Sequence, residues 1–135
     1  VIVQDARLIH LVDVTKGLKS GGWILLNAPG LPADLAPFQG FKLACVDAAH
    51  IALEHGLGAK NQPITNTAMM GAFARLFSNP PLESVVEAIE SEMPIKISEN
   101  VAAARAAYEA VVLHGQVNGS ELLPSAGPIF RKAVS

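Results

Sequence analysis

Charged residues are scarce in this sequence of 135 residues. They make up 16% of the chain, against about 25% in a typical soluble domain, whereas 50% of the residues are hydrophobic. So few charges cannot coat the whole surface of an ordinary monomer, and the buried core of a protein interface is depleted of charge. We therefore predict that the chain is a subunit whose surface is partly covered by other chains.

Cysteine occurs once, at Cys45. A single thiol cannot form an internal disulfide bond, and a single thiolate cannot hold an iron–sulfur cluster or a structural zinc ion. The four histidines are scattered; His50 and Glu54 share a helical face, but no third ligand accompanies them. No serine has the local signature of a nucleophile elbow. The sequence indicates no metal site and no catalytic residue on this chain.

Long apolar runs and basic clusters are also missing. No apolar run approaches the ~18 residues of a membrane span, and the net charge of -2 includes no basic run that could neutralise phosphates. No secretory signal is recognisable. We expect a cytoplasmic protein with no membrane span and no nucleic-acid partner. Val1 already reads as the middle of a strand, so the chain is expected to be a fragment or a processed product.

Short apolar runs alternate with helical patterns in the first half of the chain. We expect strands at 1–3, 23–26, 43–46 and 63–65. Continuous apolar strands separated by helices are typical of parallel sheets that are covered on both faces. The expected fold class is therefore α/β, an open, mostly parallel sheet with flanking helices, followed by a C-terminal helical segment and an extended tail.

Apolar residues at helical spacing predict five helices. The first covers 8–18, or two shorter segments if Asp13 is a second cap that breaks it. The second follows a cap at Asp47 and runs to His55, and the third begins at a cap formed by Asn66 or Thr67. The fourth helix covers about 82–93, and the fifth runs from about 97 to near Gly115. The tail at 116–135 has no clear period, and its apolar pairs suit an arm laid on a partner.

The third predicted helix, within the stretch 63–76, is the most informative of these elements. Met69 and Phe73 fall on one face, and Gly71 and Ala72 form a flat second face, so the helix is expected to be covered on both sides. A glycine inside a helix costs about 1 kcal/mol relative to alanine. Gly71 therefore indicates that another backbone comes too close to leave room for a Cβ atom.

A small polar residue follows each predicted strand: Asp5, Asn27, Asp47 and Asn66. Ligands of open α/β sheets bind beyond the carboxyl ends of the strands, so these four residues are candidates to line one cofactor-binding crevice. The alternative is that they only cap helices and form turns, which Asp and Asn do readily. The glycines at 56 and 58 lack a third partner and follow a helix, so a phosphate-binding loop is not indicated.

An ordered series of stretches carries a family resemblance. It comprises residues 1–5, 12–27 and 47–53, the segment Asn66-Thr67-Ala68-Met69-Met70-Gly71-Ala72, the pair Leu82-Glu83 and the helix at 100–108. In this order and spacing the chain resembles the gamma subunit, or gamma domain, of the 2-oxoacid:ferredoxin oxidoreductases that act on pyruvate, 2-oxoglutarate, indolepyruvate or phenylglyoxylate. The expected domains are a gamma-type α/β domain at 1–115, without the glycine-rich segment that opens the family's domain, and a tail at 116–135.

The resemblance implies a multi-subunit enzyme that oxidatively decarboxylates a 2-oxoacid, commonly to an acyl-CoA. The complex is expected to carry thiamine diphosphate, Mg and 4Fe-4S clusters on other chains, to use coenzyme A as co-substrate and to reduce ferredoxin or another acceptor. This chain would bind no cofactor alone and would serve subunit assembly and access of substrate or coenzyme A. Asn66, Thr67 and Gly71 match the family's motif as structural or interface positions, and no catalytic residue carries over.

A second reading stays open from the residues alone. The chain would then be a stand-alone nucleotide-binding or dimerisation module that uses the strand-end crevice.

Overall fold

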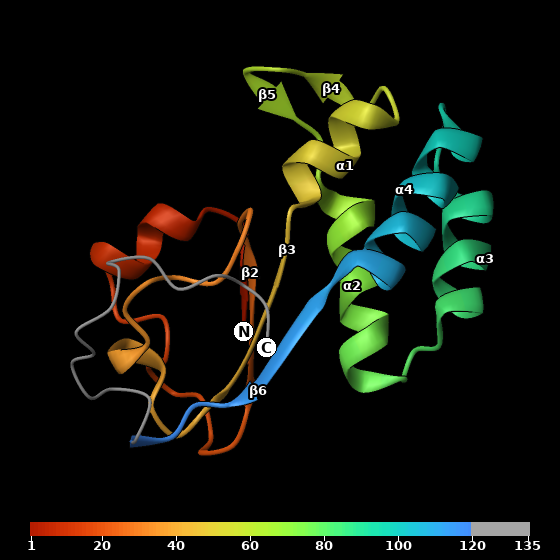
Figure 1. Ribbon diagram of the computed structural model, residues 1–135. Helices are drawn as coiled ribbons and strands as arrows, with labels where there is room; N and C mark the ends of the chain where they lie inside the picture. Colours follow the sequence, from red (N-terminus) through yellow and green to blue (C-terminus); the bar gives the residue numbers. More distant parts are fainter. Residues whose placement is uncertain (120–135) are drawn as a thin grey trace. The chain divides into compact units, whose positions relative to one another are not determined.

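A computed structural model describes residues 1–119, which form two compact units (Figure 1). Among the described residues, the sheet unit comprises Val1–Cys45 and 112–119, and the helical unit comprises Val46–Val111. The proposed arm at 116–135 lies outside the described residues except for its first four positions.

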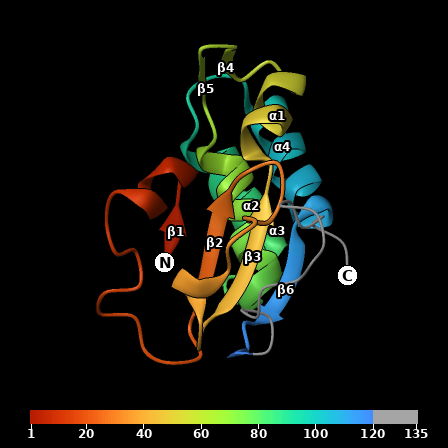
Figure 2. The same ribbon diagram turned by 60° about the vertical axis from the view of Figure 1, so that its left-hand side comes forward.

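A four-stranded sheet organises the sheet unit, in the order β1-β2-β3-β6. β1 (Ile2–Val3) pairs in parallel with β2 (Trp23–Asn27), and β2 lies beside β3 (Lys42–Val46) with the same direction (Figure 2). β6 (Val112–Gln116) pairs antiparallel with β3. The first three predicted strands and the mostly parallel sheet are confirmed.

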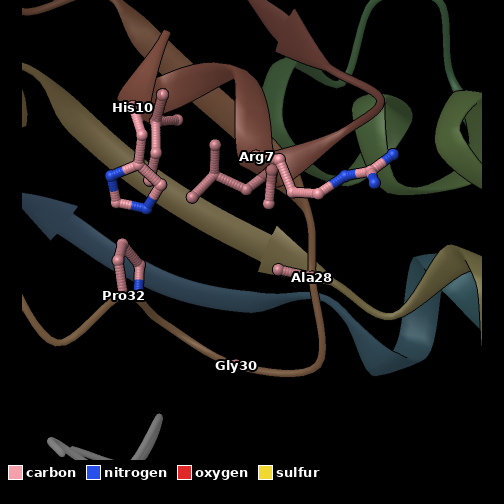
Figure 3. A pocket seen from close by; sticks show the side chains of 8 residues that line it. Arg7, His10, Ala28, Gly30 and Pro32 are labelled. Carbon is pink, nitrogen blue, oxygen red and sulfur yellow. The ribbon is translucent and has the colours of Figure 1, made fainter.

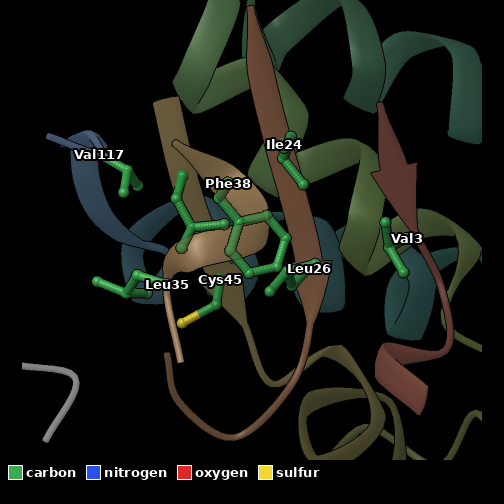
Figure 4. Close-up of a cluster of buried hydrophobic side chains, with 8 residues drawn as sticks. Val3, Ile24, Leu26, Leu35, Phe38, Cys45 and Val117 are labelled. Carbon is green, nitrogen blue, oxygen red and sulfur yellow. The ribbon is translucent and has the colours of Figure 1, made fainter. Parts of the chain in front are cut away.

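One layer of apolar side chains holds the sheet unit together (Figure 4). The sheet strands contribute Val3, Ile24, Leu26, Leu43 and Cys45, alternate positions within β2 and β3, as expected when successive side chains point to opposite faces. Leu35, Phe38 and Val117 cover this layer from outside the sheet, and Phe38, the last residue of the short 3-10 helix η2 (Ala36–Phe38), is fully buried. The Cys45 thiol is buried within this core.

The predicted helix at 8–18 is wrong. The structure has only the 3-10 helix η1 (Ala6–His10), and a series of turns follows it. The Asp13 carboxylate accepts hydrogen bonds from the Thr15 backbone N–H at 3.0 Å and from the Thr15 hydroxyl at 2.6 Å. Such local bonds compete with helical hydrogen bonding, and Gly17 then adopts a φ of +84°, outside the helical region.

The helical unit contains α1 (Ala48–Glu54), α2 (Asn66–Phe77), α3 (Leu82–Glu92) and α4 (Ile97–Ala110). The predicted cap of α1 is confirmed, because the Asp47 carboxylate accepts the backbone N–H of His50 at 3.1 Å. α1 ends at Glu54 with His55 as its C-cap, and Gly56 follows with a φ of +71°. α3 and α4 begin close to their predicted starts.

The predicted strand at 63–65 is not a strand of the main sheet. β5 (Gln62–Pro63) pairs only with β4 (Gly58–Ala59), as a small antiparallel hairpin. The two intervening residues make this pairing entirely local. Proline in this short segment also lacks the N–H that an inner sheet strand would donate.

The last predicted helix also ends earlier than expected, at Ala110 and not near Gly115. Val111 is already extended, with φ −60° and ψ 133°, and β6 follows directly. β-branched residues favour strands, and the alanine-rich pattern before them concealed this boundary. β6 was missed because a five-residue strand that contains a glycine gives a weak signal.

α2 and α4 cross at Gly71, as the glycine predicted. A Cβ atom at this position would lie 2.0 Å from the backbone carbonyl oxygen of Ala104. Ala103, Ala104 and Ala107 of α4 are fully buried, so small side chains on both helices permit the approach. The two backbones therefore meet with no room for a side chain at Gly71.

Replacing Gly71 with alanine is expected to destabilise the protein, although alanine is the better helix former. The added methyl group collides with backbone, and overpacking of this kind costs about 1–3 kcal/mol. Urea unfolding followed by circular dichroism measures the change. Because the obstacle is a backbone oxygen, adding Ala104→Gly should not restore stability; recovery in the double variant, or a Gly71→Ala protein as stable as the wild type, would contradict the crossing.

Candidate functional site

Polar side chains gather at the carboxyl ends of β1 and β2. The Asp5 carboxylate caps η1 by accepting the Arg7 backbone N–H at 3.0 Å, and it accepts the Arg7 guanidinium through Nε at 2.9 Å and Nη2 at 2.6 Å. The side-chain amide of Asn27 donates to the backbone carbonyl of Gln4 at 3.0 Å and so joins the ends of the two strands. Asp5 and Asn27 therefore have structural bonds at adjacent strand ends.

A pocket of about 250 Å³ lies beside these strand ends (Figure 3). Residues of η1 line one side of the pocket, and Leu26 of β2 lines the other together with Ala28, Gly30 and Pro32 of the loop that follows. The imidazole of His10 lies near Pro32, whereas the Arg7 guanidinium extends away from them (Figure 3). The lining is mainly apolar with an imidazole at its edge, so the pocket suits an apolar part of a ligand, such as the adenine ring of a nucleotide, better than its phosphates.

The ion pair between Asp5 and Arg7 controls the charge beside this pocket. The Arg7 side-chain hydrogen bonds, followed by its backbone N–H, lower the pKa of the Asp5 carboxyl to about 2. The two side chains are 43% and 88% exposed, so water and salt screen the pair. Asp5 is therefore ionised over the physiological range, with its charge offset by Arg7.

The other two strand-end candidates belong to the helical unit. Asp47 caps α1, and Asn66 is the exposed first residue of α2. The predicted cap at Asn66 or Thr67 is wrong, because Thr65 occupies the cap position of α2 and makes no side-chain capping bond. Asn66 also does not follow a strand of the main sheet. A cofactor-binding role for Asp5, Asn27, Asp47 and Asn66 stays a prediction.

Thr67 belongs to a buried polar connection that the sequence did not reveal. Its hydroxyl donates to the Asn100 side-chain oxygen at 2.8 Å, and the Asn100 amide donates to the backbone carbonyl of Lys96, also at 2.8 Å. Thr67 is 7% exposed and Asn100 is 3% exposed. The motif residues Thr67 and Gly71 thus both contact α4, one by a hydrogen bond and the other by close backbone packing.

Metal ligands do not converge in the described part of the chain. Within residues 1–119, no group of three or more His, Cys, Asp or Glu side chains is placed to hold a metal ion. His50 and Glu54 form an exposed pair at 2.9 Å on α1. None of the helices in this part is both long and apolar enough to cross a membrane.

A mostly parallel sheet and an alanine-rich helical unit define a mixed α/β protein. The profile of the family described as pyruvate ferredoxin/flavodoxin oxidoreductase matches residues 1–110. The chain belongs to this family, which confirms the resemblance seen in the sequence.

Individual relatives agree with the family match. The chain is 40% identical over 114 residues to the pyruvate synthase subunit PorC of Methanothermobacter thermautotrophicus, covering 82% of this chain and 58% of the relative. It is 42% identical over 113 residues to the common gamma subunit of the pyruvate/ketoisovalerate oxidoreductases of Pyrococcus furiosus, covering 81% and 59%. The chain therefore spans under two thirds of these relatives.

A solved structure supports the fold. The crystal structure of the pyruvate oxidoreductase subunit PORC of Thermotoga maritima is similar, with a TM-score of 0.70 and 31% identity over 84% of this chain and 63% of that one.

The Asp5 carboxyl is expected to titrate at about pH 2, and Arg7→Gln should move its pKa up toward 3.8. A carboxyl whose pKa is lowered on folding stabilises the protein above its unfolded pKa, and this contribution disappears as the pH falls toward 2. Carbon-detected NMR titration measures the pKa in both proteins. The same Asp5 pKa in both would show that Arg7 does not bind it in solution.

Thr67→Val is expected to destabilise the protein by about 1–3 kcal/mol, because it leaves the buried Asn100 oxygen without its donor. In a double-mutant cycle with Asn100→Ala, the two losses should not add, since each variant removes the same bond. Urea unfolding of the four proteins gives the coupling energy. Additive losses would mean that the hydroxyl does not bind Asn100.

Proposed function

We propose that this chain is the non-redox gamma component of a multi-subunit 2-oxoacid:ferredoxin oxidoreductase located in the cytoplasm. The supporting observation is the family match over residues 1–110, which covers the first segment of the sheet unit and nearly all of the helical unit. Two relatives are named subunits of pyruvate or ketoisovalerate oxidoreductases. The activity proposed for the complex is the oxidative decarboxylation of a 2-oxoacid, commonly to an acyl-CoA, with transfer of the electrons to ferredoxin or another acceptor.

The side chains of this chain support the proposal that other subunits hold the cofactors. Its single cysteine, Cys45, is buried in the sheet core, where the thiol is not accessible to an external cluster. Thiamine diphosphate, Mg and the 4Fe-4S clusters would therefore be held by the thiamine-binding and ferredoxin-like partner subunits. When bound there, these groups supply the decarboxylation and electron-transfer chemistry.

Assembly is the role that this chain's surface supports best. Several large apolar side chains of the helical unit are exposed: Ile64, Met70, Phe77, Ile95 and Ile97, with exposed fractions from 39% to 69%. Together with the low charge content, these side chains favour contact with other subunits. The pocket beside β1 and β2 supports the further proposal that this chain helps to shape access for the substrate or coenzyme A.

The pocket beside β1 and β2 also favours a second candidate function. A stand-alone binding module would use such a pocket at the carboxyl ends of parallel strands for a small ligand. The isolated chain would then be monodisperse and bind an adenine nucleotide or coenzyme A with a micromolar Kd. A gamma component alone should instead show weak binding and a tendency to self-associate, because its subunit contacts are exposed.

Anaerobic purification of the tagged chain from its native host is expected to yield 2-oxoacid-dependent reduction of a viologen. The same fractions should contain iron and thiamine diphosphate, and coenzyme A should increase the rate. A panel of pyruvate, 2-oxoglutarate, indolepyruvate, phenylglyoxylate and ketoisovalerate would identify the substrate. A lone, colourless and inactive chain, from cells in which the enzyme is active, would contradict the proposal and favour the binding module.

A further inference from the structure

A groove of about 340 Å³ lies between α2 and α3 in the helical unit. Its walls include Met70 of α2, Val85, Ala88 and Ile89 of α3, and Met93 just after α3. Val85 and Ile89 are about 6% exposed and form the base, whereas Met70 is 39% exposed. Two methionines at the sides make the groove adaptable, because methionine side chains are flexible and polarizable.

The acidic composition of α3 indicates what kind of segment this groove accepts. Glu83, Glu87, Glu90 and Glu92 all lie on α3, and the helix contains no basic residue. Arg105 pairs with Glu83 at 2.8 Å and also interacts electrostatically with Glu90, whereas no ion pair among the described residues involves Glu87 or Glu92. Glu92 lines the groove itself.

The position of Glu92 is electrostatically unfavourable for the isolated helix. Glu90 and Glu92 occupy the last turn of α3, where the helix dipole is negative and a cation is preferred. A cation supplied from outside the chain would remove this repulsion. The apolar base and the carboxylate at its end therefore fit a ligand that combines apolar side chains with a positive charge.

We propose that the α2/α3 groove binds an amphipathic segment of another subunit of the oxidoreductase, with apolar anchors over Val85, Ala88 and Ile89 and a Lys or Arg that pairs with Glu92. This inference rests on the proposed function, because it assigns one of the subunit contacts of the gamma component. Apolar anchors at helical spacing are the usual way in which one helix occupies such a groove.

The test uses the complete oxidoreductase complex, isolated through the tagged chain. The tagged chain is separated from its partner subunits and then allowed to bind them again. Glu92→Lys should raise the Kd of this re-association at least tenfold in a surface-based binding assay. Glu109→Lys, the same charge change at an exposed position on α4, should change the Kd less than twofold. The Glu92→Lys chain should unfold at the same or a higher temperature, because lysine suits the end of a helix.

A photo-crosslinking amino acid in place of Ala88 identifies the occupant. After irradiation of the assembled complex, mass spectrometry should find crosslinks to a peptide of another subunit that contains Lys or Arg among apolar residues. Crosslinks to a second copy of this chain, to its own residues, or to no subunit would overturn the proposal, as would an unchanged Kd for Glu92→Lys.

The two proposals fail differently in this experiment. If the complex carries 2-oxoacid activity but the groove is not crosslinked, the gamma function stands and the groove assignment falls. If no oxidoreductase subunits accompany the wild-type chain, both proposals fall.

Discussion

The contact between Gly71 and the Ala104 carbonyl is the constraint on which the helical unit depends. It brings two helix backbones within the distance that a single Cβ atom would occupy. The same crossing lets the Thr67 hydroxyl reach Asn100, because close helices can satisfy a short buried polar side chain. α3 packs Val85 and Ile89 against Ala74 and Ala104, which leaves the acidic side of α3 for other contacts.

The sequence correctly predicted structural features that are signalled by a single residue or by its neighbours in the chain. Asp47 precedes an apolar helical pattern, so its capping role could be predicted, and Gly71 signals a close approach because alanine would otherwise be preferred. The helix at 8–18 could not be excluded in the same way, since the turn at Asp13 depends on competition between its carboxylate and the helical backbone. β6 depends on pairing with β3, a contact distant in sequence that periodicity does not reveal.

The strand-end site was likewise predicted only in part. Asp5 and Asn27 could be placed at strand ends, but their bonds to Arg7 and Gln4 are contacts that no motif announces. These bonds satisfy the polar groups of Asp5 and Asn27 within the sheet unit, which agrees with the proposal that other subunits carry the redox chemistry. Within the described residues, the exposed apolar side chains of the helical unit and the carboxylates of α3 are suited to protein contacts.

Hydrogen–deuterium exchange of this chain, free and within the assembled oxidoreductase, tests most directly whether the helical unit contacts other subunits. Assembly should slow amide exchange in α3 and in the first turns of α2, since docked helices open less often. The buried core of the sheet unit should exchange slowly in both states and so serve as an internal reference. Unchanged exchange throughout residues 66–92 in an active complex would contradict the claim that this chain contributes its helical unit to assembly.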